Sequence, residues 1–231
     1  MNEETEDNTF EEGRILLINK PLEWTSFDVV KKIRNIIRVK KVGHAGTLDP
    51  LATGLLIVCT GKFTKQISEF MSLPKEYTGT ITLGANTPTY DLESEPQNFQ
   101  STEGITESEI RATAIKFTGE QLQIPPVHSA IKQKGKPVYL KARRGEEVIM
   151  EPRKIKIEKF EITRIELPEL DFKIKCSTGT YIRSIANDFG KDLGCGGYLS
   201  QLCRTRIGDF HIDRAMTMEN LVEFFKNENL S

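Results

Sequence analysis

Residues 43–54 read Gly-His-Ala-Gly-Thr-Leu-Asp-Pro-Leu-Ala-Thr-Gly, and the continuous apolar run Leu55–Cys59 follows directly. The glycines, aspartate and proline predict a loop over Val42–Gly54. An apolar run without alternation is typical of a strand buried on both faces. Because Asp49 precedes proline, helix is disfavoured there, and its carboxylate is expected on an extended or turn segment beside a rigid strand. For a lone Asp-Pro pair, the simpler interpretation is a carboxylate that only stabilises a turn.

Segments on either side predict a mixture of strands and helices. Ile15–Asn19 reads as a short apolar strand, and Tyr77–Gly84 alternates with period two. A helix is expected to begin at Ser26, which can cap it. Further strands are expected at 155–165, 172–176, 198–204 and 206–212, and further helices at 61–71, 106–117, 180–193 and after Thr217. Strands and helices interleave without a strict β-α-β repeat, so the expected fold class is α+β with a mixed sheet.

The charge of the chain is unevenly distributed. The net charge is −1, but residues 1–12 carry six acidic residues and no basic one, which leaves the remainder at +5. Basic residues gather in two clusters, and local clusters matter more than the total charge when the partner is a polyanion. Two solvated faces are the alternative interpretation. The clusters consist of Lys31, Lys32, Arg34, Arg38, Lys40 and Lys41, and of Lys132, Lys134, Lys136, Lys141, Arg143 and Arg144.

The cysteines and histidines do not indicate a metal site. The four cysteines form no Cys-x-x-Cys pair, and the three histidines lie far from them in the sequence. There is no phosphate-binding glycine motif, so we expect neither a metal nor another cofactor. No segment resembles a signal peptide or a membrane span. The sequence therefore predicts a cytoplasmic protein with reduced, mostly buried thiols.

Six segments carry a family resemblance. They are Asn19-Lys20-Pro21, residues 43–54, Lys75-Glu76-Tyr77, residues 125–132 (Pro-Pro-Val-His-Ser-Ala-Ile-Lys), residues 176–183 (Cys-Ser-Thr-Gly-Thr-Tyr-Ile-Arg) and residues 193–204. In this order they resemble the motifs of the tRNA pseudouridine synthase B (TruB) family, over about residues 13–212. Several ordered motifs are more specific than any single one. The run 49–54 is more similar to the bacterial tRNA enzymes than to the archaeal and eukaryotic guide-RNA relatives.

The resemblance implies a fold and a domain organisation. The pseudouridine synthase fold has a central mixed, mostly antiparallel sheet flanked by helices, with an inserted RNA-gripping thumb, here at about residues 125–150. Residues 1–12 are expected to be a disordered acidic tail and residues 13–212 the catalytic domain. Residues 213–231 would form a C-terminal helix in place of a full RNA-binding domain of the PUA type.

The resemblance also implies roles for individual residues. Asp49 would be the nucleophile, and Arg183 would pair with it and keep it ionised. Tyr77 would stack on the target uracil and help to remove its C5 proton. His44 would fill the space that the flipped nucleotide leaves, rather than act as a general base. The implied substrate-binding residues are His44, Tyr181, Leu202, Lys20, Lys132, Lys134, Lys136, Arg143 and Arg144.

The implied activity is the isomerisation of uridine to pseudouridine at position 55 in the T loop of tRNA, by base flipping and attack of Asp49. Whether the carboxylate attacks the uracil ring or the ribose stays open. The expected partner is the T arm of tRNA, with no membrane and no protein partner, and the protein is expected to be a monomer. Two alternatives are a pseudouridine synthase for another RNA and a non-catalytic RNA-binding protein of the same fold. The second alternative does not explain why Asp49, Tyr77 and Arg183 occur together.

Overall fold

Two units make up the computed structural model, which describes residues 8–129, 131–133, 136–138, 144, 146 and 148–228. The first unit comprises Met1–Tyr77 and Leu202–Ser231, and the second comprises Thr78–Gln201. The segment 13–212, expected to be one catalytic domain, is thus shared between the two units. The C-terminal residues belong to the first unit rather than standing apart.

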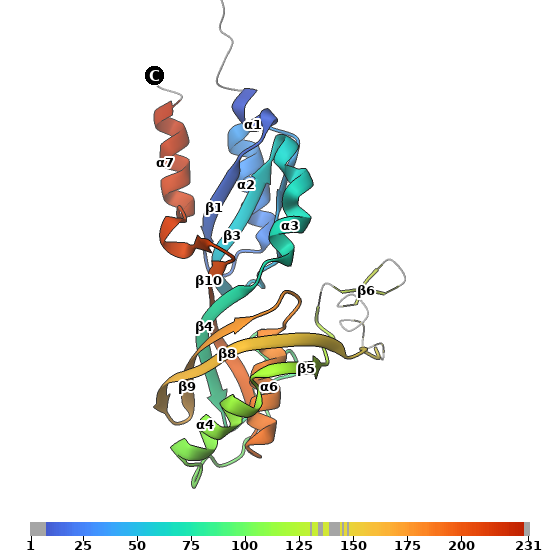
Figure 1. The fold of residues 1–231 in the computed structure, drawn as a ribbon, viewed down its shortest axis with the longest axis vertical. Helices are drawn as coiled ribbons and strands as arrows, with labels where there is room; N and C mark the ends of the chain where they lie inside the picture. Colours follow the sequence, from blue (N-terminus) through green and yellow to red (C-terminus); the bar gives the residue numbers. More distant parts are fainter. Residues whose placement is uncertain are drawn as a thin grey trace, which may run out of the picture. The chain divides into compact units, whose positions relative to one another are not determined.

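The first unit is built on strand β3, which spans Ala52–Thr60 (Figure 1). It pairs antiparallel with β1 (Ile15–Lys20) and with β2 (Val42–His44), and parallel with β10 (Gly197–Ile207) through Leu202–Arg204. Residues 55–59 of β3 are fully buried, which confirms the predicted strand with two covered faces. The prediction of a loop over Val42–Gly54 is wrong at both ends, because β2 and the start of β3 occupy them.

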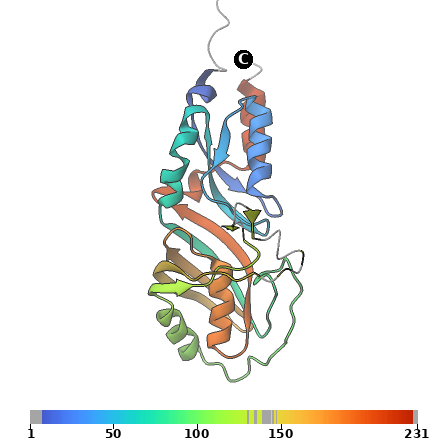
Figure 2. The same cartoon turned by 90° about the vertical axis from the view of Figure 1, so that its right-hand side faces the viewer.

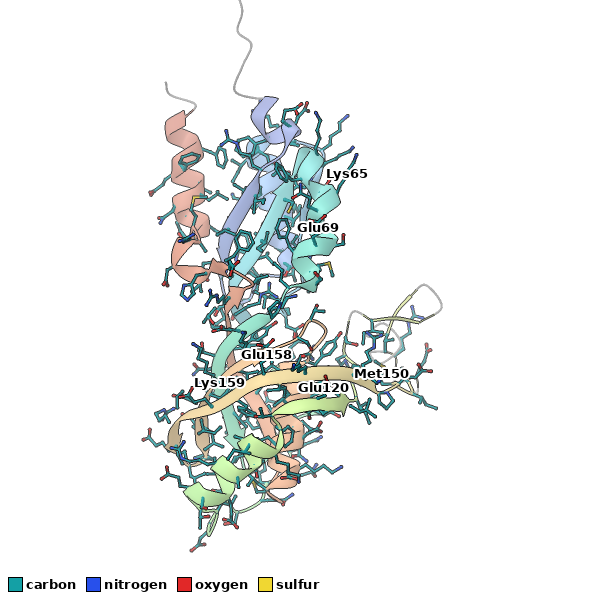
Figure 3. The ribbon with its side chains drawn as sticks, viewed as in Figure 1. Lys65, Glu69, Glu120, Met150, Glu158 and Lys159 are labelled. Carbon is teal, nitrogen blue, oxygen red and sulfur yellow. The ribbon has the colours of Figure 1, made fainter. Side chains whose placement is uncertain are left out.

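Helices cover both faces of β3. On one face, Leu56 and Val58 pack with α2 (Ser26–Ile37) and α7 (Met218–Glu228). On the other face, Leu55, Ile57 and Cys59 pack against a 3-10 turn, Gly61–Gln66, and α3, Ile67–Ser72. Lys65 of the 3-10 turn and Glu69 of α3 project into solvent (Figure 3). Alternate residues of one strand therefore contribute to two cores, as the pleat of a β-strand requires.

The ends of two helices differ in how well the sequence predicted them. Thr25, not Ser26, caps α2, because Thr25 and Asp28 form a reciprocal capping box. The predicted cap of α7 is confirmed, since the Thr217 hydroxyl accepts a hydrogen bond of 3.1 Å from the Asn220 amide. Thr25 and Ser26 both carry a hydroxyl, but only Thr25 lies three residues before the Asp28 carboxylate, and this spacing makes Thr25 the cap.

The acidic N-terminal segment is not irregular throughout. Residues Asn8–Glu12 form a short helix, α1, so the expected tail over 1–12 is wrong for these five residues. Phe10 is buried, with its ring centroid 5.4 Å from that of Phe225 on α7. The Arg14 guanidinium lies 4.8 Å from the centroid of the Phe10 ring, a cation–π contact. An aromatic side chain in the acidic segment thus anchors it to the C-terminal helix.

The second unit has a sheet in the order β10-β4-β9-β8-β5, whose strands are labelled in Figure 1 and seen after a 90° turn in Figure 2. These strands are β4 (Lys75–Leu83), β9 (Glu169–Cys176), β8 (Arg153–Glu166) and β5 (Gly119–Gln123). β9 and β5 both pair antiparallel with β8. With the parallel pairing of β3 and β10, the mixed, mostly antiparallel sheet of the predicted fold class is confirmed. A two-residue hairpin, β6 (Lys132–Gln133) and β7 (Lys136–Pro137), lies in the expected thumb.

β10 corrects a sequence prediction. The strand expected at 198–204 and the start of the one expected at 206–212 are one continuous strand, Gly197–Ile207, whose residues 202–204 pair with β3 and 206–207 with β11 (Phe210–His211). The chain turns through Gly208 and returns as β11, with Ile207 opposite Phe210.

Two helices cover one face of the sheet in the second unit. They are α4 (Glu107–Lys116), whose predicted capping box of Thr106 and Glu109 is confirmed, and α6 (Ile182–Asp192). Phe189 of α6 packs on Phe160 of β8, with ring centroids 5.5 Å apart. Among the described residues, no helix combines the length and the hydropathy that crossing a bilayer requires.

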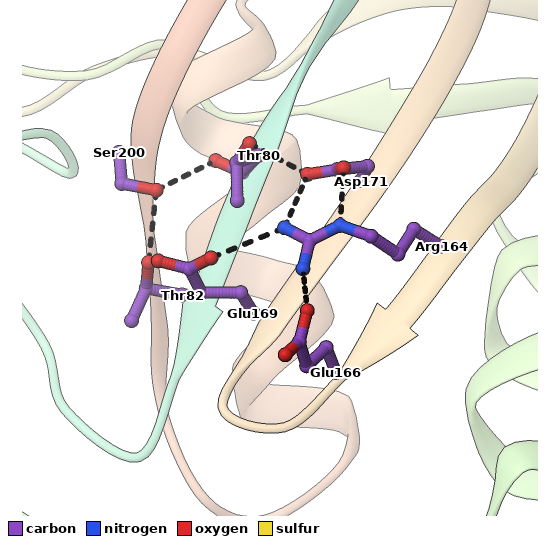
Figure 4. Close-up of polar contacts among 7 residues, drawn as sticks. All are labelled: Thr80, Thr82, Arg164, Glu166, Glu169, Asp171 and Ser200. Carbon is purple, nitrogen blue, oxygen red and sulfur yellow. Dashed lines mark hydrogen bonds and ion pairs between the residues drawn. The ribbon is translucent and has the colours of Figure 1, made fainter.

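The opposite face of this sheet is polar (Figure 4). Arg164 of β8 donates to Asp171 and Glu169 of β9, with donor–acceptor distances of 2.6 and 3.1 Å. The Thr80 hydroxyl donates to Asp171 over 2.8 Å, and the Ser200 hydroxyl donates to the Thr80 carbonyl over 3.2 Å. Solvent-exposed ion pairs of this kind contribute little to stability, so the network is characteristic of a solvated sheet face.

Candidate active site

The segment that carries Asp49 is tied to the start of α2. The buried Ser26 hydroxyl accepts a hydrogen bond of 2.9 Å from the Leu48 amide and donates one of 3.2 Å to the Leu48 carbonyl. The Glu23 amide donates to the Pro50 carbonyl over 2.9 Å. The Ala52 amide donates to the Asp49 carbonyl over 3.1 Å, which leads the loop into β3. The half-buried Asp49 is therefore held between backbone contacts on both sides.

Lys20 lies beneath this loop and not on the surface. Its side chain is fully buried, and its ammonium group donates to the carbonyls of Pro21, Trp24 and Pro50 at 2.9, 2.5 and 3.3 Å. Burial lowers the pKa of Lys20 from 10.5 to about 8, an effect that the charge of Asp49 partly opposes. With its three N–H groups given to carbonyls, Lys20 has the geometry of a loop anchor, and its predicted contact with the substrate stays a prediction.

Arg204 of β10 is a second buried cation at this loop, and sequence reasoning missed it. Its guanidinium donates to the Leu55 carbonyl over 2.8 Å and to the Gly46 carbonyl over 3.0 Å. Gly54 has φ of +105°, and a Cβ atom there would lie 2.4 Å from the Arg204 carbonyl oxygen, so only glycine fits. The available signal was the position of Arg204 at the end of the last family motif.

His44 lies on β2 and is half-buried. Burial lowers the pKa of its imidazole, the Arg204 guanidinium lowers it further, and the backbone of Gly46 acts in the opposite direction. The ring is therefore neutral at neutral pH, which suits a flat side chain that stacks and not one that pairs with phosphate.

The remaining predicted residues of the first unit lie on β10 and β4. In the parallel pairing of β3 and β10, Leu202 is directly opposite Ala52, which lies three positions after Asp49. The Leu202 carbonyl accepts a hydrogen bond of 3.3 Å from the Thr53 hydroxyl. Tyr77 is buried on β4. The register of β3 with β10 thus brings Leu202 to the end of the strand that Asp49 precedes.

Arg183 is buried in the second unit, near the start of α6. Its Nε atom lies 3.5 Å from Oδ2 of Asp91, with about 5% of each side chain exposed. Its two terminal nitrogens donate to the carbonyls of Thr89 and His128 over 3.2 and 3.0 Å. Asp91 also accepts from the Glu93 amide over 3.0 Å, which shapes the turn that follows it. The sequence did not indicate the pairing of Arg183 with Asp91.

Tyr181 caps α6 and is fixed by a residue that sequence reasoning also missed. The buried side-chain amide of Gln123 accepts from the Tyr181 N–H over 2.8 Å and donates to the Tyr181 carbonyl over 3.0 Å. These two bonds hold the peptide of Tyr181 from both sides and so fix the start of the helix that carries Arg183.

The predicted thumb residues are only partly described. Lys134 and Arg143 lie outside the described residues. Lys132 and Lys136 lie on β6 and β7, but their side chains are also outside the described part of the chain. Arg144 is exposed, and its guanidinium is 3.9 Å from the carboxylate of Glu146. Their contact with RNA stays a prediction.

Comparison with known proteins assigns the family. Residues 34–182 match the N-terminal domain of the TruB family of pseudouridylate synthases, and residues 183–231 match the C-terminal domain of tRNA pseudouridylate synthase B. The chain belongs to the TruB family.

Relatives of this TruB-family chain agree with that assignment. It is 53% identical over 212 residues to the tRNA pseudouridine synthase B of Flavobacterium johnsoniae, covering 89% of this chain and 93% of that protein. It is 52% identical over 217 residues to the tRNA pseudouridine synthase B of Chloroherpeton thalassium, covering 92% and 90%. A chain in the crystal structure of a Cbf5-Nop10-Gar1 complex superposes with a TM-score of 0.76 at 29% identity, over 99% of this chain. This chain spans about 60% of that one.

The residue roles that the TruB resemblance implies stay predictions. Asp49 belongs to the first unit and Arg183 to the second, so their pairing stays a prediction. In the first unit the structure groups Asp49 with Lys20, through the Pro50 carbonyl and the mutual effect of their charges. In the second unit it groups Arg183 with Asp91 and Tyr181 with Gln123.

Proposed function

We propose that the protein isomerises uridine to pseudouridine at position 55 in the T loop of tRNA. Family membership over residues 34–231 and two relatives named tRNA pseudouridine synthase B support this function. The chemistry rests on the geometry of the Asp49 loop. Lys20, Ser26 and Arg204 bond to the backbone of this loop, while Asp49 itself is half-exposed.

The proposed reaction needs one nucleophile and no redox change. The Asp49 carboxylate adds to the uracil ring or to the ribose C1′, and the bond between C1′ and N1 breaks. The base turns, a bond forms between C1′ and C5, and the carboxylate leaves. C5 loses its proton and N1 gains one, so the product is an isomer of the substrate. Part of this proposal is that Arg183 pairs with Asp49, since a neighbouring guanidinium keeps a carboxylate ionised.

The substrate uridine must leave its stack before it can react, which costs a few kcal/mol. In the proposal, stacking on Tyr77 offsets part of this cost, because each base–aromatic contact contributes about 1–3 kcal/mol. The neutral ring of His44 stacks against bases that the flipped nucleotide leaves behind. Tyr181 and Leu202 line the uracil site. The RNA phosphates are neutralised by Lys132, Lys134, Lys136, Arg143 and Arg144. The protein acts as a cytoplasmic monomer, and tRNA is its only partner.

The test is the substitution Asp49→Asn, which keeps the size of the side chain and removes its charge. Unmodified tRNA transcript is incubated with each protein, and pseudouridine is mapped chemically at every position. We expect product at position 55 with the unchanged protein and none with Asp49→Asn, while tRNA binding changes by less than about threefold. Asp209→Asn, at an exposed turn of the same unit, is the matched control and should stay active.

Substantial turnover by Asp49→Asn would refute the nucleophile assignment. Product at other positions, or in another RNA only, would refute the proposed substrate. Binding without product from the unchanged protein would favour a non-catalytic RNA-binding protein.

A further inference from the structure

Two large apolar side chains are exposed at the start of α2. Leu22 is 54% exposed and Phe27 is 62% exposed. Single exposed apolar residues are common on protein surfaces and need no explanation. These two lie five positions apart, on the segment that ties down the Asp49 loop.

That segment is fixed in place by long-range hydrogen bonds. The Glu23 amide and the Lys20 ammonium group both donate to the Pro50 carbonyl, and the Ser26 hydroxyl bonds to Leu48 in both directions. Leu22 lies between Lys20 and Glu23, and Phe27 follows Ser26 directly. The two apolar side chains therefore belong to the backbone segment that holds Asp49, and little backbone conformational entropy is lost when they bind.

The charges around them are divided along the helix. Lys31 lies one turn beyond Phe27, at the i+4 position, and is exposed, as is Lys32. Asp28 is also exposed, but its carboxylate is engaged by the amide and hydroxyl of Thr25, and these hydrogen bonds lower its pKa. Glu23, next to Leu22 in the chain, is also an exposed acid. Phosphates are thus disfavoured at the first turn and favoured one turn later.

We propose that Leu22, Phe27, Lys31 and Lys32, here called the α2 rim, contact the RNA strand beside the flipped uridine. This inference rests on the proposed function. Unstacked bases expose apolar faces, which Leu22 and Phe27 cover, while Lys31 and Lys32 meet the phosphates one turn along the helix. Exposed aromatic groups beside cations are what single-stranded RNA requires. A stable protein interface buries about 800 Å² on each partner, far more than two side chains supply.

The α2 rim is tested with two variants and one control. Phe27→Ser removes the aromatic face, and the double substitution Lys31→Gln with Lys32→Gln removes the charges. Phe99→Ser is the same exchange at a residue that is 78% exposed in the second unit. Binding of tRNA transcript is measured at several salt concentrations, and pseudouridine formation is measured at saturating protein. Thermal unfolding verifies that each variant is folded.

Phe27→Ser should weaken tRNA binding about tenfold, by the same factor at every salt concentration, because no charge is lost. The double lysine variant should weaken binding and reduce the slope of log K against log salt by about 1.5. Phe99→Ser should bind like the unchanged protein. Phe99→Ser should also form product at the normal rate, because Phe99 lies outside the α2 rim and the proposed catalytic residues.

Unchanged affinity in both rim variants would overturn the proposal, as would an equal loss in Phe99→Ser. A change in oligomeric state without a change in tRNA binding would show that the rim contacts protein. Should the unchanged protein bind tRNA through Phe27 but form no pseudouridine, the rim stands and the proposed function fails.

Discussion

Lys20 gives the structure a measurable pH dependence. The substitution Lys20→Met removes the charge and keeps an unbranched apolar stem of similar length. It also removes the Lys20 donor from the carbonyls of Pro21, Trp24 and Pro50, of which Pro50 still accepts from the Glu23 amide. That second loss is the same at every pH, so the titration of the ammonium group is isolated by the difference between the two proteins.

The magnitude follows from the pKa of Lys20 in the two states. Folding lowers it from 10.5 to about 8, mainly through burial. Between these values the unfolded chain binds more protons than the folded one, so the free energy of unfolding rises with pH. Linkage gives an increase of about 2 kcal/mol between about pH 7 and about pH 9.5, out of about 3 kcal/mol for the whole window.

The assay is urea unfolding of both proteins at a series of pH values, with the difference in the free energy of unfolding plotted against pH. Other groups that titrate in this range contribute equally to both proteins and cancel. The stability of the unchanged protein relative to Lys20→Met should rise through the window. A flat or falling difference would refute the argument, because it would mean that the ammonium group is not desolvated in the folded state.

Two further predictions concern the backbone of each unit. Glu23 has φ of +65°, a conformation that costs a residue with a side chain about 1–2 kcal/mol. Glu23→Gly should therefore raise the free energy of unfolding in urea by about 1 kcal/mol. A decrease would show that the Glu23 side chain stabilises the turn. Gln123→Leu removes both bonds to the Tyr181 backbone and should lower single-turnover pseudouridine formation about tenfold with little change in tRNA affinity. Gln123→Glu should recover activity as the pH falls, since the protonated acid can again donate, and an equal loss of rate and affinity would contradict a positioning role.

The sequence predicted the elements whose signal is local. The unbroken apolar run of β3 and the capping box of Thr106 and Glu109 identify themselves within a few residues. β5 does not, because Gly-Glu-Gln-Leu-Gln has neither alternation nor β-branched residues. It is a strand because its residues pair with β8, as Leu122 does with Lys154. Tertiary pairing overrides local propensity there.

The candidate site divides in the same way. Asp49 was found from its local sequence and the family motif around it. Most of the bonds that hold it were not, because they join residues far apart in the chain. Lys20 donates to a carbonyl thirty positions away, and Arg204 donates to carbonyls more than a hundred positions away. Lysine and arginine are rarely fully buried, so composition favours surface positions for both.

Lys20 and Arg204 hold the backbone on the two sides of Asp49, at Pro50 and at Gly46, and Lys20 also interacts with the charge of Asp49. The described hydrogen bonds of Lys20 and Arg204 all go to backbone carbonyls, and these bonds orient the loop. Charge interactions are reciprocal: the charge of Asp49 raises the pKa of Lys20, and a protonated Lys20 must equally favour the ionised form of Asp49. Removing the Asp49 charge must therefore move the Lys20 titration to lower pH. The Asp49→Asn protein should then gain its Lys20-dependent stability at lower pH, and an unshifted window would show that the two charges are uncoupled.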